Sequence, residues 1–267
     1  MKELSLQELK NIEYNLLEVF DAFCKENGIR YFLGYGTLLG AIRYKKFNPW
    51  DDDVDLLIPR EDYLRMISLF KDTDRYKLFA YEKDPNYLFP FAKLCDMTTV
   101  KKENNSTNDV EVGVDIDLFP LDAWDDDLEK ARSEVKYISK NLMGLNLSKL
   151  KKPDSVNPVK RFAKGIAMFF CRMKGSRHYI ENITKACTRK DQKGKNYKGC
   201  KVWCVYGERG IVPAEAFAET VEVEFEGKMF PAPGGYDTYL TCLYGDYLPE
   251  PPKEKQKTHH SFKAYLR

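Results

Sequence analysis

Residues 48–59 read NPWDDDVDLLIP, with four carboxylates at Asp51, Asp52, Asp53 and Asp55 directly beside an apolar run. Like charges this close oppose one another's ionisation, so the group is costly unless solvent, basic side chains or a bound cation offsets it. The alternation that follows is typical of a half-buried strand, in which Asp53 and Asp55 would point to the same side. The stretch therefore predicts a strand that begins at a charged site.

A second strand with an acidic face is expected at residues 109–122, DVEVGVDIDLFPLD. Its alternation places one set of apolar residues toward the core: Val110, Val112, Val114, Ile116 and Leu118. Glu111, Asp115 and Asp117 share the other face. Carboxylates on two strands can meet at one edge of a sheet and hold a hard cation such as Mg²⁺, so a metal site is expected there.

The remaining elements complete an α/β pattern. Ser5 and Glu8 have the spacing of a capping box before an amphipathic helix that Gly28 ends. Further strands are expected at 29–36, 76–80 and 89–96, and helices at 37–43, near Arg60 and at 125–142. We therefore expect a mixed sheet flanked by helices. Residues 1–145 would form a catalytic lobe, and residues 146–267 a basic, mainly helical second lobe.

Composition indicates a packed globular protein. The chain has 267 residues, 43% of them hydrophobic, with 16 Phe and 17 Tyr, which argues against disorder. It shows neither a signal peptide nor an apolar run of the ~20 residues that span a bilayer, so a cytoplasmic location is expected. Seven scattered Cys fit reduced thiols, and a zinc knuckle built on Cys200 and Cys204 with Cys187 or His178 is the alternative.

Charge is distributed unevenly along the chain. Residues 140–207 hold 17 Lys or Arg and 3 acidic residues, although the net charge of the whole chain is only +2. Such a block attracts phosphates or an anionic surface, or it is simply a solvated lobe rich in lysine. A basic module that binds nucleic acid or anionic lipid would leave the acidic strands unexplained, so no nucleic-acid partner is expected.

The basic block contains a predicted amphipathic helix, with Asn157 as its cap and Pro158 at its first position. One face of this helix is apolar: Val159, Phe162, Ile166, Phe169, Phe170 and Met173. Two interpretations are open. The face could pack on the catalytic lobe, or it could hold the protein at the anionic inner face of a membrane.

The acidic stretch itself also has alternatives. A solvated acidic turn is one. A calcium loop is another, because Asp51, Asp53, Asp55 and Asp62 fall at loop positions 1, 3, 5 and 12. The calcium loop needs Gly at its sharp turn, where Leu56 stands in a strand-like run. We therefore favour a catalytic metal site. Such a site suits phosphoryl transfer, because Mg²⁺ held by carboxylates neutralises negative charge on the phosphoryl oxygens. A further carboxylate can accept the proton of the attacking hydroxyl. The glycines of the turn GYGT at 34–37 would let backbone N–H groups approach a phosphate closely.

Five ordered blocks carry a resemblance to a known family: FLGYGTLLGAIR, PWDDDVDLLIPREDY, DIDLFPLD, FEGKMFPAPGGYDTYL and YGDYLPEPPKEKQKTHH. Together they resemble the LicD family of phosphotransferases, which includes bacterial phosphorylcholine transferases and is related to the human fukutin-related protein. The resemblance implies a nucleotidyltransferase-like fold and a CDP-alcohol donor, with CDP-choline favoured. The phosphoalcohol would pass to a sugar hydroxyl of a cell-surface glycan, such as teichoic acid or lipopolysaccharide, or of its lipid-linked precursor, and CMP would leave.

The resemblance also assigns roles to residues of this chain. It implies that the catalytic and metal-binding acids are Asp51, Asp53, Asp55 and Asp117, around Mg²⁺ or Mn²⁺, with one of them as general base. It places Gly36, Thr37 and Arg43 in the glycine-containing motif on the donor side, and His259 and His260 at the end of the last motif. The family usually has an apolar or aromatic residue where this chain has Asp115.

Two further points complete the expectations. Lys93 could neutralise a donor phosphate, or it could be a surface lysine of a strand. A quaternary ammonium would suit an aromatic cage, which this Tyr-rich chain could supply. The rival activity is that of a nucleotidyltransferase that moves a nucleoside monophosphate, because the same carboxylates would serve either leaving group.

Overall fold

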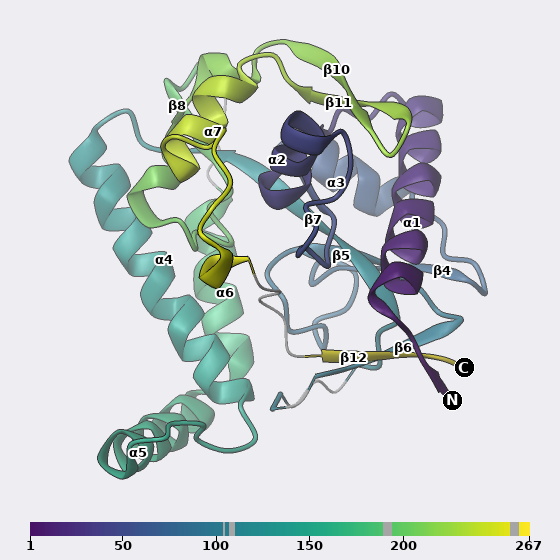
Figure 1. The fold of residues 1–267 in the computed structure, drawn as a ribbon. Helices are drawn as coiled ribbons and strands as arrows, with labels where there is room; N and C mark the ends of the chain where they lie inside the picture. The colour runs from purple at the N-terminus through teal and green to yellow at the C-terminus, as the bar shows by residue number, and fades with distance from the viewer. Residues whose placement is uncertain (104, 107–109, 189–193, 257–261) are drawn as a thin grey trace.

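A mixed sheet forms the centre of the protein in its computed structural model, which describes residues 1–103, 105–106, 110–188, 194–256 and 262–267 (Figure 1). The strand order is β2-β3-β7-β5-β4, with β8 paired to β7 and β9 to β8. These strands are β2 (Phe32–Leu33), β3 (Asp55–Pro59), β4 (Tyr76–Phe79), β5 (Ala92–Asp96), β7 (Val114–Ala123), β8 (Tyr197–Gly199) and β9 (Val212–Pro213). Only β3 and β7 run parallel among these pairs, so the expected mixed α/β sheet is confirmed.

Two smaller sheets and the helices surround this centre. The first small sheet joins β1 (Lys2–Glu3), β12 (Phe262–Leu266) and β6 (Thr99–Glu103), and brings the two termini together; the second joins β10 (Thr220–Phe225) and β11 (Lys228–Pro233). The helices are α1 (Leu6–Asn27), α2 (Tyr35–Tyr44), α3 (Arg60–Leu69), α4 (Leu128–Lys149), α5 (Pro158–Lys174), α6 (Ser176–Cys187) and α7 (Tyr236–Tyr244). Figure 1 shows α1 on one flank, α4 with α6 on the other, and α5 beyond the end of α4.

Local sequence signals fix several helix ends as predicted. The Ser5 side chain accepts a hydrogen bond from the Glu8 N–H, the Glu8 side chain accepts one from the Ser5 N–H, and Gly28 ends α1 in the left-handed conformation. Asn157 caps α5 through the N–H groups of Val159 and Lys160. The first residues of these helices are therefore set by capping hydrogen bonds within a few residues, as the sequence predicts.

The second acidic strand begins later than expected. β7 starts at Val114, so Val110 and Val112 precede it. Gly113 lies against the backbone of Asp96 with no room for a Cβ, and the Lys101 N–H donates to the carbonyl of Val112. The chain before Gly113 therefore pairs toward β6, although Val112 is still buried. The strand expected at 29–36 is also shorter, since only Phe32–Leu33 pairs.

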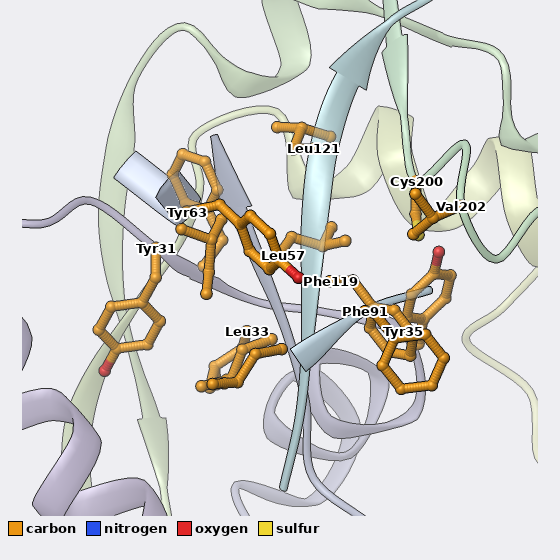
Figure 2. Packing of buried hydrophobic residues seen from close by; sticks show 14 of the residues in the cluster. Tyr31, Leu33, Tyr35, Leu57, Tyr63, Phe91, Phe119, Leu121, Cys200 and Val202 are labelled. Atoms are coloured by element: carbon orange, nitrogen blue, oxygen red, sulfur yellow. The ribbon is translucent and has the colours of Figure 1, made fainter. Parts of the chain in front are cut away.

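The apolar core is continuous across the sheet. Figure 2 shows Leu57 of β3 and Phe119 of β7 within this cluster, together with Phe91 and Tyr35, and Cys200 lies beside them. The expected lobe boundary at residue 145 falls inside α4, and residues on both sides of it belong to the same core. The part after residue 145 contains both helices and strands. The division into two lobes stays a prediction.

A buried ion pair ties α3 to the end of β7. The Arg60 guanidinium donates two hydrogen bonds to the Asp122 carboxylate, Nε to Oδ1 at 2.8 Å and Nη2 to Oδ2 at 2.7 Å. Both side chains are buried. Removal of either partner would leave an uncompensated buried charge, which would be strongly destabilising. The pair therefore holds α3 against β7, the strand that carries Asp115 and Asp117.

The interpretation of the predicted 158–174 helix as packed by its apolar face is wrong. Only Met168 of α5 is buried. The apolar face is exposed to solvent, through Val159, Phe162, Ile166, Phe169, Phe170 and Met173. The helix therefore contacts the rest of the protein through its opposite side.

Candidate active site

The acidic loop before β3 is held against the start of α2. Asn48 Nδ2 donates to the Gly36 carbonyl at 2.9 Å and to Asp51 Oδ2 at 3.1 Å. Gly36 has no room for a Cβ, because the Asp51 carboxylate occupies that space. The glycine of the GYGT turn therefore allows an acidic side chain to approach the backbone.

This loop gathers three carboxylates. Ligand oxygens of Asp51, Asp52 and Asp53 lie within 4.8 Å of one another, and they form the one such group of metal-ligating side chains among the described residues. Asp52 is buried and was not among the predicted ligands. The zinc knuckle expected as an alternative at the cysteines is not assembled in the part of the chain that the structure describes, where none of the seven Cys forms a disulfide.

Strand register brings the other two predicted acids together. Asp55 of β3 lies opposite Asp117 of β7 in the parallel pair, and Lys93 of β5 lies opposite Asp117 on its other side. Residues paired in this way share one face of the sheet, so the three side chains form a row across it. Thr37 supports the row from α2, since its Oγ1 accepts the Asp55 N–H at 2.9 Å.

The carboxylates around Asp55 are more numerous than the basic side chains that offset their charge. Burial raises the pKa of Asp55 well above its ordinary value. The neighbouring carboxylates of Asp53 and Asp117 raise it further, and Lys93 offsets only part of this effect. A divalent cation would supply the missing positive charge, and carboxylate oxygens are the ligands that Mg²⁺ prefers. These residues therefore fit the metal site that the sequence predicts.

Asp115 has a different environment from Asp117. The side chain of Asp115 is 1% exposed and forms ion pairs with both Lys93 and Lys101, the latter at 2.6 Å. Burial opposes its ionisation, but Lys101 and Lys93 lower its pKa to about 2. Asp117 also pairs with Lys93, yet its side chain is 20% exposed. Asp115 is thus a buried counter-ion for two lysines, whereas Asp117 remains accessible.

A cavity of about 390 Å³ opens beside this row, between the sheet and the end of α4. Its acidic and basic lining includes Asp53, Lys93, Lys101, Glu103, Asp115, Asp117, Lys149 and Asp154. Its aromatic lining is Phe89, Phe91, Trp203 and Phe262. An opening lined by carboxylates, ammonium groups and aromatic rings suits a phosphorylated ligand that also carries a cation.

Sequence reasoning missed Lys149 as part of this cavity. Its Nζ donates to the Leu88 carbonyl at 3.1 Å and lies 3.5 Å from the centre of the Phe89 ring. Burial lowers the pKa of Lys149 to about 8. In the sequence this lysine precedes two more in a segment that resembles a basic connection, so nothing local separates it from solvated lysines.

Sequence reasoning also missed Glu13, a residue of α1 whose carboxyl group is close enough to Asp52, Asp53 and Asp115 to be affected by their charges. The side chain is buried, and Oε2 makes no hydrogen bond within the described residues. Burial raises the pKa of Glu13 well above its ordinary value, and Lys101 opposes this only in part. The protonated form is therefore favoured, which avoids one more negative charge beside a crowded group.

The other predicted residues take several positions. Arg43 donates to the carbonyls of Tyr247 and Pro249, so it anchors the C-terminal segment to α2. Beside the acidic loop, the Trp50 ring packs edge-on against the Tyr44 ring of α2. His259 and His260 lie outside the described residues.

Comparison with known proteins decides the family. A family model described as LicD/FKTN/FKRP, nucleotidyltransferase domain, matches residues 28–141. The lipopolysaccharide cholinephosphotransferase LicD of Haemophilus influenzae is 31% identical over 282 aligned positions, which cover 100% of both chains. The chain belongs to the LicD family. The LicD match at 28–141 contains the acidic loop and strands β3, β5 and β7.

Two shorter matches each cover about two fifths of the chain. An uncharacterised protein of Rickettsia prowazekii is 33% identical over 106 residues, which is 39% of this chain and 36% of that protein. The mannosyltransferase regulator 4 of Saccharomyces cerevisiae is 29% identical over 114 residues, which is 40% of this chain and 9% of that protein. Of these three relatives, the Haemophilus influenzae protein is the one that aligns with the whole chain.

Proposed function

We propose that this LicD-family protein transfers phosphocholine from CDP-choline to a sugar hydroxyl of a cell-surface glycan, or of its lipid-linked precursor, and releases CMP. The observation that supports this most strongly is the row of Asp55, Asp117 and Lys93 beside a cavity that Asp53 also lines. The full-length similarity to a lipopolysaccharide cholinephosphotransferase supports the choice of cargo.

In this proposal the acids Asp51, Asp53, Asp55 and Asp117 hold Mg²⁺, or Mn²⁺ in its place. The bound metal would neutralise charge on the phosphate oxygens of the donor. Gly36 and Thr37 keep the acids in place through the close approach of Asp51 and the hydrogen bond to Asp55.

The proton of the attacking hydroxyl needs an acceptor that reaches the cavity. Asp53 and Asp117 are the two of the four acids that line it, so one of them accepts this proton in the proposed reaction. The sugar oxygen then forms a bond to the phosphorus of phosphocholine, and the bond from that phosphorus to the bridging oxygen breaks with departure of CMP. Lys93, held by Asp115 and Asp117, adds positive charge next to the phosphate.

The choline group would lie against the aromatic wall. Lys149 already covers the Phe89 ring, and Lys101 lies 4.1 Å from the centre of the Phe262 ring. Trp203 has no cation over its ring within the described residues, and it packs edge-on against Phe91 at 5.2 Å. A quaternary ammonium binds most strongly over Trp, so we assign the choline subsite to Trp203.

Residues 146–267 would act as a basic, mainly helical second lobe whose C-terminal motif completes the site, with the protein at the cytoplasmic face of the membrane. The lobe supplies Trp203 and Lys149 to the cavity. Arg43 also ties the segment after α7 to the catalytic part, which would bring the last motif toward the acids.

A panel of CDP-alcohols tests the proposal. The protein is incubated with Mg²⁺, a glycan acceptor and CDP-choline, CDP-ethanolamine, CDP-glycerol or CDP-ribitol, and nucleotide products are separated. CMP release that requires both acceptor and metal, and that is fastest with CDP-choline, is expected. Release of pyrophosphate from a nucleoside triphosphate, with no CMP from any CDP-alcohol, would instead indicate a nucleotidyltransferase.

A further inference from the structure

Helix α5 presents an apolar stripe to solvent. Six side chains form the stripe, with exposed fractions from 46 to 75%: Val159, Phe162, Ile166, Phe169, Phe170 and Met173. At ~100° per residue these six fall within an arc of about 100°, and the buried Met168 lies on the opposite side of the helix. Pro153 and Pro158 border a shallow hollow of about 670 Å³ on this surface. A contiguous apolar surface of this kind marks an interaction site.

The charge on the same helix is entirely positive. Residues 158–174 contain five basic side chains, Lys160, Arg161, Lys164, Arg172 and Lys174, and no acidic one. Lys164 pairs with Asp154, so at least part of this charge is compensated within the protein. The remaining basic groups flank the apolar stripe and complement a negatively charged surface.

The length of α5 and the side chains it carries indicate which kind of surface its apolar stripe would contact. α5 has 17 residues, and none of the described helices has the length and apolar character needed to cross a membrane. A helix with an aromatic apolar face and basic flanks is typical of elements that lie in the headgroup region of a bilayer. We propose that α5 docks on an anionic phospholipid surface, with its apolar stripe in the bilayer and the exposed side chains of Lys160, Arg161 and Lys174 at the lipid phosphates.

The docking helix is tied to the rim of the cavity. The Arg172 guanidinium donates to the carbonyls of Leu150 and Lys151, and Lys164 pairs with Asp154. Leu150 and Asp154 both line the cavity beside the acids. A bilayer that binds α5 would therefore lie next to the cavity. This position favours an acceptor sugar that is carried on a membrane lipid. The conclusion about the acceptor rests on the proposed function, whereas the docking of α5 does not.

Vesicle flotation of the full-length protein tests the docking. Vesicles of phosphatidylcholine alone are compared with vesicles that also contain phosphatidylglycerol. We expect binding only to the anionic vesicles, weakened by salt because surface charge is screened. Phe162→Ser together with Phe169→Ser should lower the partition coefficient at least ~10-fold, and Lys160→Glu together with Lys174→Glu should do the same.

Matched changes on α4 serve as controls, because this helix also carries exposed apolar and basic residues. Tyr137 and Met143 are 49% and 60% exposed, so Tyr137→Ser with Met143→Ser removes exposed apolar surface without touching α5. Lys136→Glu with Lys140→Glu changes the net charge by the same amount at another exposed place. Both control proteins are expected to float like the wild type.

Three outcomes would overturn the docking. The wild type could fail to bind anionic vesicles, it could bind neutral and anionic vesicles equally, or it could form a dimer that the two Phe substitutions dissociate, in which case the stripe would be an interface between copies. CMP release with a soluble acceptor provides the separate test of the proposed function. The Phe variant should retain this turnover, and a wild type that floats without releasing CMP would refute only the proposed function.

Discussion

Asn substitutions at Asp115 and Asp117 should separate stability from turnover, although the two residues lie on the same face of one strand. Both residues line the cavity, but the side chain of Asp115 is 1% exposed and pairs with Lys93 and Lys101, whereas that of Asp117 is 20% exposed and lies opposite Asp55. Asp115→Asn removes the charge that two buried ammonium groups share. Asp117→Asn removes a partially exposed charge, and Lys93 keeps Asp115 as its partner.

The expected sizes follow from these environments. Removing one partner of a buried ion pair costs about 3–5 kcal/mol of folding free energy, so Asp115→Asn should lower stability by this amount. An unfolding entropy of ~2.1 cal/mol/K per residue gives about 0.6 kcal/mol/K for the whole chain, and a fall in Tm of about 5–9 °C. Asp117→Asn should change Tm less, but it should lower turnover at least ~100-fold if the residue holds the metal or accepts the proton.

Urea unfolding and CMP release measured on the same protein samples provide the test. Asp74→Asn is the matched control, because this exposed acid lies between α3 and β4 and should leave both quantities unchanged. Asp115→Asn should shift the urea midpoint without changing the slope. The reasoning fails if Asp115→Asn is as stable as the wild type, or if it lowers turnover of the folded protein more than Asp117→Asn does.

Four further predictions address the metal, the loop, the buried lysine and the aromatic wall. Asp53→Asn should lower turnover at least ~100-fold with the fold intact, and chelation of Mg²⁺ should abolish CMP release; near-normal activity would refute the metal assignment. Gly36→Ala should displace the Asp51 carboxylate and raise the Mg²⁺ concentration needed for half-maximal rate, without a change in charge; an unchanged metal titration would contradict this. Lys149→Met should raise stability by up to about 3 kcal/mol below pH 8, because the folded state lowers the lysine pKa from 10.5 to about 8. Between the folded pKa of about 8 and the unfolded pKa of 10.5, Lys149 carries a proton in the unfolded chain but not in the folded one. The free energy of unfolding of the wild type should therefore rise with pH in this range, and the stability difference between Lys149→Met and the wild type should vanish above pH 10.5. A difference that is independent of pH would refute the burial argument. Trp203→Ala should raise KM about 10-fold for CDP-choline and leave KM for CDP-glycerol nearly unchanged, whereas equal effects on both would exclude a choline subsite there.

The sequence by itself determined the features that depend on neighbouring residues. The capping box at Ser5 and Glu8, the cap at Asn157 and the strand that follows Asp53 are all present as predicted. Each depends on hydrogen bonds or side-chain direction within a few residues, so local spacing is enough to specify it. The resemblance of ordered motifs also identified the family, which full-length similarity confirms.

Tertiary structure decided the strand pairing that brings the expected acids together, the basic side chains that join them, and the surfaces that stay exposed. The parallel pairing of β3 with β7 places Asp55 opposite Asp117, and the antiparallel pairing with β5 adds Lys93 to the row. Lys149 reaches the same cavity from the end of α4. Partners so distant along the chain are fixed by register and packing, which spacing within one element does not reveal. The same holds for α5, whose apolar periodicity is local but whose exposure depends on which side the rest of the protein covers.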